Sequence, residues 1–151
     1  MDVDHEILED FLVEAGEILE QLSEQLVDLE KSPDDKDLLN SIFRGFHTVK
    51  GGAGFLQLDA MVECCHKAEN LFDLLRNGSV QVSPELMDVV LQSLDAVNIM
   101  FGNVRAGEAL DAASPALLQR LADFASGKAE QDAVLDVAVP PVEDVVQADT
   151  S

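Results

Sequence analysis

Basic residues are scarce in this sequence. Nine lysines and arginines stand against thirty aspartates and glutamates among 151 residues, so the formal net charge is -21. A charge of this sign and size repels nucleic-acid phosphates and anionic membrane surfaces. We therefore expect no nucleic-acid partner and no association with a membrane.

Long apolar runs and cysteine are also nearly missing. No apolar stretch approaches the ~20 residues that span a bilayer, and the acidic start lacks the basic segment of a signal peptide. The two cysteines, Cys64 and Cys65, are neighbours without a CxxC spacing, so we expect buried, reduced thiols and no metal site. These absences indicate a soluble, cytoplasmic chain without membrane insertion.

Apolar residues recur at intervals of three and four in five segments, which is the period of a one-sided helix. Ser83-Pro84 and Ser114-Pro115 place a capping serine before a proline at two predicted helix starts, and Asp59 is expected to cap another helix. We predict an all-α fold in which four long helices form an up-and-down bundle and a fifth helix packs on one side. The predicted helices cover roughly residues 4–30, 38–53, 59–76, 84–104 and 115–126.

The composition changes after the fifth predicted helix. Residues 129–151 contain six acids, no base and two adjacent prolines, without a sustained helical stripe. We therefore expect a folded domain over residues 1–127 and an acidic flexible linker over residues 128–151, leading to domains that are not in this chain.

His47 lies at the edge of the apolar stripe of the second predicted helix. Gly51 and Gly54 follow one and two turns later on the same exposed strip, although a glycine inside a helix costs about 1 kcal/mol relative to alanine. Their missing side chains leave room for another protein's active site over the imidazole. Arg44 and Lys50 each lie about one turn from His47, so cations that could balance a phosphate flank the ring.

The surrounding segment is electrically neutral. Residues 41–76 contain four bases and four acids, within a chain that is otherwise strongly acidic. An anionic phosphoryl donor can therefore approach here with less repulsion than elsewhere.

A neutral imidazole is nucleophilic near pH 7, and its two nitrogens can divide attack and anchoring between them. A carboxylate that accepts a hydrogen bond from one nitrogen fixes the tautomer and strengthens the other nitrogen. Glu69 lies at the shoulder of the third helix's apolar stripe, from which it can reach a neighbouring helix, and His66 lies further round. The sequence therefore predicts a pair between His47 and Glu69.

Two linked segments carry a resemblance to a known family. The segment IFRGFHTVKGGAGF, from Ile42 to Phe55, resembles the phosphorylation-site helix of CheA-type chemotaxis histidine kinases and contains the pattern HxxKGxAG. The segment HKAENL, from His66 to Leu71, is similar to that family's HxxENL segment. The resemblance covers roughly residues 4–126 and implies an N-terminal histidine phosphotransfer (HPt) domain.

The resemblance implies a function for these residues. His47 would take the γ-phosphoryl group of ATP on Nε2 and pass it to an aspartate of a response regulator. Glu69 would bond the other ring nitrogen, Lys50 and His66 would complete a polar network, and Gly51 would provide bare surface. The implied partners are the ATP-binding domain of a CheA-type kinase and CheY-like and CheB-like receiver domains. The isolated domain is expected to be a monomer, because the family dimerises through a later domain.

The catalytic elements of phosphoryl transfer are missing from the sequence. It contains no P-loop, no glycine-rich nucleotide lid and no acidic metal-binding cluster. We therefore expect a phosphoryl carrier without a cofactor of its own, with ATP and Mg²⁺ bound by a separate kinase domain.

Three alternatives stay open. Glu63 and His66 fit the ExxH spacing of di-iron carboxylate bundles, although such bundles need a second motif of this kind. A pure adaptor bundle that binds partner helices is another possibility, but it leaves the glycines beside His47 unexplained. A free-standing phosphorelay carrier would use the same site.

Overall fold

The computed structural model describes residues 2–126, with side chains from residue 5 onward; the predicted linker over residues 128–151 lies outside the described residues. This part of the chain forms five helices and no strand: α1 (Asp2–Lys31), α2 (Lys36–Phe55), α3 (Asp59–Arg76), α4 (Pro84–Ala106) and α5 (Pro115–Ser126). None of these helices is long and apolar enough to cross a bilayer.

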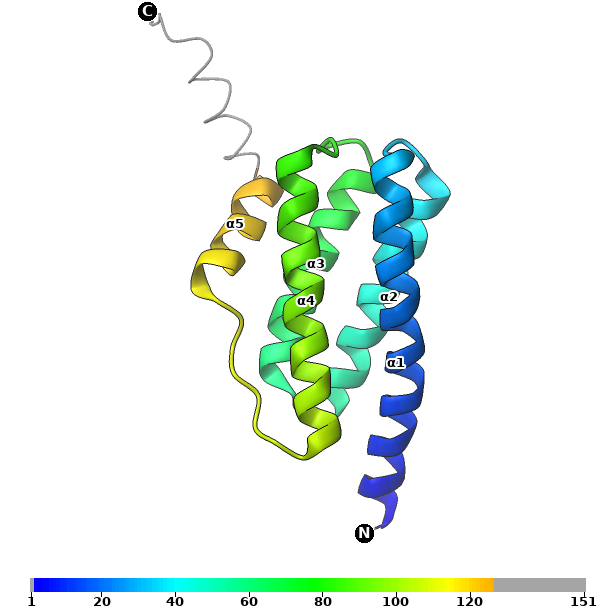
Figure 1. Cartoon of the computed structure of the whole chain (residues 1–151), viewed down its shortest axis with the longest axis vertical. Helices are drawn as coiled ribbons and strands as arrows, with labels where there is room; N and C mark the ends of the chain where they lie inside the picture. Colours follow the sequence, from blue (N-terminus) through cyan, green and yellow to red (C-terminus); the bar gives the residue numbers. More distant parts are fainter. Residues whose placement is uncertain (1, 127–151) are drawn as a thin grey trace, which may run out of the picture.

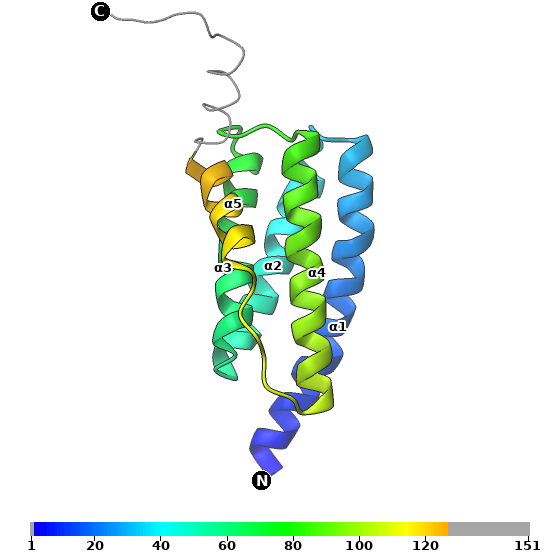
Figure 2. The same cartoon turned by 60° about the vertical axis from the view of Figure 1, so that its left-hand side comes forward.

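Helices α1 to α4 run alternately up and down, as Figure 1 shows. Each of them packs against the next, and α4 returns to α1, so the four helices close around one core. Helix α5 packs on the outside against α3 and α4, which is clearest in Figure 2. The predicted all-α bundle with an additional fifth helix is confirmed.

The helix starts follow from local side-chain chemistry. Ser83 and Ser114 each accept a hydrogen bond from the backbone N–H three residues later, at 3.1 and 3.4 Å, ahead of a proline. Asp35 caps α2 in the same way at 3.1 Å. The prediction that Asp59 caps the third helix is wrong, because Leu58 occupies the N-cap without a side-chain bond and Asp59 is the first helical residue. There its carboxylate can still favour the helix by facing the positive end of the dipole.

The predicted apolar stripes form the core. Phe46 of α2 stacks on Phe72 of α3 with ring centroids 5.8 Å apart, and Phe11 of α1 meets Phe101 of α4 at 6.1 Å. The largest fully buried side chains include Phe46, Phe72, Leu22, Leu26, Leu29, Ile42, Met61, Leu71, Leu86 and Leu121. One continuous core therefore fixes the position of α2 relative to α3, which is the geometry on which the site depends.

Cys64 and Cys65 are buried and unpaired, as the sequence predicts. Burial, with the neighbouring charge of Glu63, raises the pKa of the Cys64 thiol to about 11, and burial also raises the pKa of Cys65. Both thiols are therefore uncharged near neutral pH and serve as small apolar groups in the core.

Two glycines of α2 allow a close approach to α1. A Cβ atom on Gly45 would stand 2.8 Å from Leu22 Cδ2, and one on Gly52 would stand 2.7 Å from Phe11 Cδ1. Any larger residue at these positions would push the two helices apart or force the apolar side chains to move. Helix α2 thus carries glycines on two different faces, one packed against α1 and one directed at solvent.

Candidate functional site: a histidine held by a buried carboxylate

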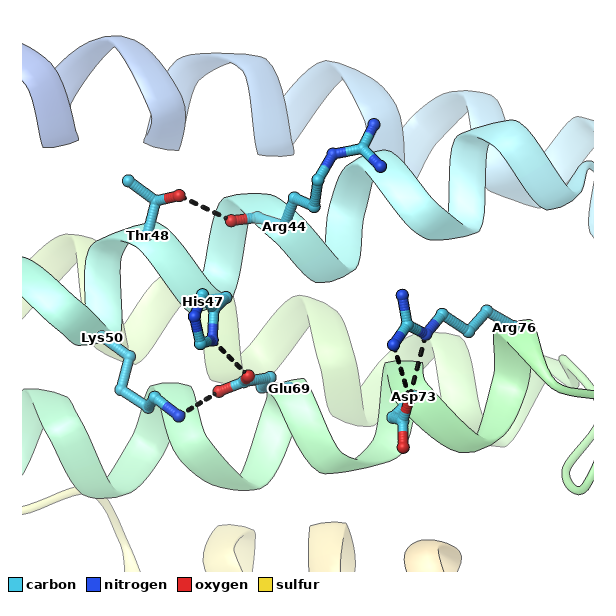
Figure 3. A network of polar contacts seen from close by, with 7 residues as sticks. All are labelled: Arg44, His47, Thr48, Lys50, Glu69, Asp73 and Arg76. Carbon is cyan, nitrogen blue, oxygen red and sulfur yellow. Dashed lines mark hydrogen bonds and ion pairs between the residues drawn. The ribbon is translucent and has the colours of Figure 1, made fainter.

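The centre of the site is a contact between α2 and α3, drawn in Figure 3. His47 Nδ1 lies 2.6 Å from Glu69 Oε2. The two side chains differ sharply in environment, because 61% of the His47 side chain is exposed and only 9% of the Glu69 side chain is. The predicted pairing of the imidazole with the carboxylate is present in the structure.

The charge state of Glu69 determines which nitrogen of His47 carries the proton. Burial alone would raise the pKa of the Glu69 carboxyl, but the contacts and charges of Lys50 and His47 outweigh burial and hold the pKa below its usual range. Near neutral pH Glu69 is therefore a carboxylate, which can only accept hydrogen bonds. Nδ1 consequently donates, and the neutral ring keeps its lone pair on Nε2.

The ammonium group of Lys50 compensates the negative charge on the second oxygen of the same carboxylate. Its Nζ lies 2.6 Å from Glu69 Oε1, and both groups appear in Figure 3. Oε1 is buried and has no well-aligned hydrogen bond within the described residues, so this ion pair is its main compensation. Lys50 lies one turn after His47 on α2, and a single carboxylate on α3 therefore holds both side chains in place.

A second group of side chains borders the imidazole, and the sequence did not identify it. The Phe43 ring lies nearly parallel to the His47 ring, with an angle of 10° and 6.1 Å between centroids. Arg76 of α3 places its Cζ 3.8 Å from the centre of the Phe43 ring. Asp73 and Asn40 bond the guanidinium from α3 and α2.

The structure does not bring Arg44 to the imidazole. Its side chain is exposed and points away from His47 in Figure 3, and it makes no ion pair in the described part of the chain. The Arg44 carbonyl accepts a hydrogen bond of 2.9 Å from Thr48 Oγ1. A role for Arg44 as a counter-charge to phosphate stays a prediction.

The surface that continues from His47 along α2 is bare. A Cβ atom on Gly51 would meet nothing within 4 Å, and one on Gly54 would meet only Val62 Cγ2, at 3.9 Å. Phe55 follows with 71% of its surface exposed, about 12 Å along the helix from His47. The open space predicted beside the imidazole is present; that a partner uses it stays a prediction.

His66 is exposed and makes no hydrogen bond or ion pair among the described residues. The structure therefore does not join it to His47 or Glu69, and its part in the network stays a prediction.

Glu63 is exposed as well. Di-iron sites are built from side chains that point into the bundle, so the outward position of Glu63 and His66 contradicts that alternative. Across residues 5–126 no three His, Cys, Asp or Glu side chains gather in a way that could hold a metal ion.

A comparison with known protein families shows which family this chain belongs to. The model of the Hpt domain family matches residues 6–100, which is more than half of the chain. The chain therefore belongs to the Hpt domain family, and the resemblance stated from its two sequence motifs is confirmed.

Within this family, the chain is similar to the phosphotransfer domains of CheA-type proteins. The chain is 45% identical over 105 residues to the sensor histidine kinase CheAY of Helicobacter pylori. The match covers 70% of this chain but only 13% of that protein, so the chain corresponds to a small part of the relative's length.

Two solved structures agree in fold and sequence. The solution structure of the histidine phosphotransfer domain of CheA is 30% identical, with a TM-score of 0.71, and the match covers 81% of this chain and 90% of that one. The CheA phosphotransferase domain from Thermotoga maritima is 35% identical, with a TM-score of 0.63, over 66% of this chain and 95% of that one.

Proposed function

We propose that this chain is the phosphotransfer domain of a CheA-type chemotaxis kinase and carries a phosphoryl group on Nε2 of His47. The observation that carries the proposal is the contact of 2.6 Å between His47 Nδ1 and the buried Glu69 carboxylate. It anchors one nitrogen of an exposed ring and leaves the other nitrogen as a nucleophile facing solvent.

In the charging step, the Nε2 lone pair attacks the γ-phosphorus of ATP. The N–P bond forms while the bond from the γ-phosphorus to the bridging oxygen breaks, and ADP leaves with that electron pair. The ring becomes cationic, and the Glu69 carboxylate at Nδ1–H stabilises this charge. Because the carboxylate is already in place, no reorganisation is needed as the charge develops.

In the discharging step, a carboxylate oxygen of a receiver aspartate attacks the phosphorus. The N–P bond breaks and its electron pair returns to Nε2, which restores the neutral imidazole. Gly51 offers no side chain that would hinder the approach of either protein. A partner that covers His47 with a contact area of ordinary size would extend over Gly54 as far as Phe55.

The remaining site residues support these two steps. Lys50 compensates Glu69 Oε1 and keeps the carboxylate ionised in its buried position. Arg44 and His66 are exposed and free to turn toward a phosphoryl group on the ring, and we propose that they contribute only once it is present.

We further propose the cellular setting that this function requires. The donor would be the ATP-binding domain of the kinase, which would also hold ATP and Mg²⁺, and the acceptors would be CheY-like and CheB-like receiver domains. The domain would need no cofactor of its own, would be a monomer in isolation and would work in the cytoplasm as part of a longer kinase.

The test is phosphate incorporation from labelled ATP with a CheA-type kinase core. Wild type should take up label, and His47→Gln should take up none. His5→Gln is the matched control, because His5 is also an exposed helical histidine, and its ion pair among the described side chains is with Glu9, one turn away on α1. Its labelling should equal that of wild type.

Transfer of the label to a receiver domain completes the test. Label that leaves wild type when the receiver is added supports a carrier role. Equal labelling of wild type and His47→Gln would contradict the assignment of the site, and no labelling of either protein by a matched kinase core would favour an adaptor bundle.

A further inference from the structure

The hydrogen bond to Glu69 fixes one atom of the His47 ring but leaves its tilt undetermined. With 61% of the side chain exposed, the core supplies little packing against the imidazole. In-line attack on phosphorus requires Nε2 to point in a defined direction, and a small misplacement of a reacting group lowers the rate strongly. A second contact that orients the ring plane is therefore expected.

Phe43 supplies such a contact. It precedes His47 by one turn of α2, and the two rings are nearly parallel, with 10° between their planes and 6.1 Å between centroids. This separation corresponds to an offset stack, which is a favoured arrangement for aromatic rings. Tilting of the imidazole out of this plane would disrupt the stack.

Arg76 in turn holds Phe43. Its Cζ lies 3.8 Å from the centre of the Phe43 ring, within the range of a cation–π contact. Nε and Nη2 of Arg76 both lie 2.9 Å from Asp73 Oδ1, and Nη1 donates to Asn40 Oδ1 at 3.3 Å. Figure 3 shows Arg76 and Asp73 next to each other along α3, beyond Glu69.

The anchoring of Arg76 involves both helices of the site. Asp73 lies on α3, whereas Asn40 and Phe43 lie on α2, so one guanidinium connects the helix that carries His47 with the helix that carries Glu69. The plane of the guanidinium is fixed by three donor contacts. Lysine has neither the planar shape nor the forked donors that this arrangement uses.

We infer that Phe43 and Arg76 are positioning residues that orient the His47 ring for attack through Nε2. Phe43 sets the plane of the imidazole, and Arg76 keeps Phe43 in place from the opposite helix. In this role neither residue needs to touch the phosphoryl group. The expected effect on the rate of charging rests on the proposed phosphotransfer function. The orientation of the ring, in contrast, can be measured on the unphosphorylated protein.

The test compares Phe43→Leu and Arg76→Ala with the conservative variants Phe43→Tyr and Arg76→Lys. Arg105→Ala is the matched control, since Arg105 lies over the Phe101 ring at 5.0 Å, on the side of the bundle formed by α1 and α4. Circular dichroism establishes that each variant is folded. The readouts are the imidazole ¹⁵N and ¹H resonances of unphosphorylated His47, and kcat and KM for charging by the kinase core.

We expect wild type, Phe43→Tyr and Arg105→Ala to show a single Nδ1–H tautomer of His47. Phe43→Leu and Arg76→Ala should keep the Nδ1–H tautomer that Glu69 fixes, but their His47 imidazole resonances should be shifted and broadened because the ring samples more than one tilt. Their kcat should fall about three- to tenfold with little change in KM, the size expected from loss of one aromatic contact. Arg76→Lys should recover only part of the loss.

Unchanged imidazole resonances and unchanged kcat in Phe43→Leu and Arg76→Ala would overturn the inference, and so would an equal loss in Arg105→Ala. If wild type itself takes up no phosphate, the proposed function fails instead. In that case the imidazole resonances of the variants still support or overturn the positioning role, so the two failures are distinguishable.

Discussion

Among the single residues of the site, Glu69 combines near-complete burial with contacts to two basic side chains. His47 and Lys50 approach its two carboxylate oxygens at 2.6 Å each. A buried charge without such partners would be strongly unfavourable, and here the partners lower the pKa of the carboxyl instead. Glu69 therefore contributes to stability as well as to the tautomer of His47.

The first prediction concerns the pH dependence of Glu69→Gln. Because folding lowers the pKa of Glu69, its ionised form stabilises the fold above the unfolded pKa, near 4.5, and this contribution is lost as pH falls through the folded pKa. At pH 7 we expect the variant to be less stable by about 1 kcal/mol. Denaturant unfolding of both proteins between pH 3 and pH 7 measures the difference, which should shrink below the unfolded pKa. A difference that is constant over this range would contradict the role of the ionised carboxylate.

The second prediction compares adjacent glycines on different faces of α2. Gly51→Ala adds a methyl group in open space and should stabilise the helix by about 1 kcal/mol. Gly52→Ala directs the methyl group against Phe11 and should destabilise the fold by about 1 to 2 kcal/mol, despite the same gain in helix propensity. Chemical denaturation of the two variants gives both values.

The bulky variant Gly51→Leu extends this comparison to function. It should remain folded but take up phosphate more slowly, because the side chain would occupy the strip beside His47. Normal uptake by Gly51→Leu would contradict the use of this strip by the partner.

Part of the site could be predicted from the sequence, and part could not. His47, Lys50 and the bare Gly51 share one helix face, so their relation follows from helical spacing alone. The contact with Glu69 needed only the assumption that the second and third helices are neighbours. Arg76 lies far from Phe43 in sequence, and their contact depends on the vertical register of α2 against α3, which side-chain packing decides.

At the scale of the helices, the ends of α2, α3 and α4 follow one pattern. In each case a residue in the left-handed conformation follows the helix, and its N–H group and that of the next residue bond back to carbonyls of the last turn, as in a Schellman motif. The residue in the left-handed conformation is Gly78 after α3 and Gly107 after α4, but it is Gln57 after α2, with φ of 61°. Glycine adopts this conformation without the steric cost that a Cβ atom imposes.

The third prediction follows from this exception. Gln57→Gly should stabilise the protein by about 0.5 to 1 kcal/mol, because the left-handed conformation is retained and its steric cost is removed. Gly78→Ala is the inverse control and should destabilise by a similar amount, since its φ is 84°. Thermal and denaturant unfolding test both, and a Gln57→Gly variant that is less stable than wild type would contradict this account of the turn.

The number and order of the helices could be predicted from their apolar stripes, and two starts from their Ser-Pro pairs. The start of α3 was predicted with the wrong cap, because Asp59 is a good capping residue but the tight turn after α2 places Leu58 at the N-cap. Leu58 N–H bonds to the Ala53 carbonyl at the end of α2, so one short segment ends one helix and begins the next. Such a shared turn leaves no separate signal in the sequence.

At the scale of the whole molecule, the distribution of charge agrees with the position of the site. The formal charge of the chain is -21, yet residues 41–76, which include most of α2 and α3, carry equal numbers of acids and bases. The charged residues of helix α1, in contrast, are nearly all acidic. An anionic partner therefore meets the least repulsion on the face formed by α2 and α3.

The fourth prediction concerns the extent of the domain, which the sequence places at residues 1–127. The hydrophobic core lies between Phe11 and Phe124. A chain that ends at residue 127 should therefore unfold within about 2 °C of the full chain and take up phosphate at the same rate. Thermal unfolding followed by circular dichroism and a labelling time course measure these properties, and a marked loss of either would show that residues 128–151 contribute to the domain.

The central claim is that Glu69 holds Nδ1 of His47 and thereby leaves Nε2 as the nitrogen that carries phosphate. The most direct measurement is the coupling between ³¹P and ¹⁵N in the phosphorylated, ¹⁵N-histidine-labelled domain. We predict coupling to Nε2 of His47, with Nδ1 still protonated. Phosphorus bonded to Nδ1, or to His5 or His66, would contradict the claim.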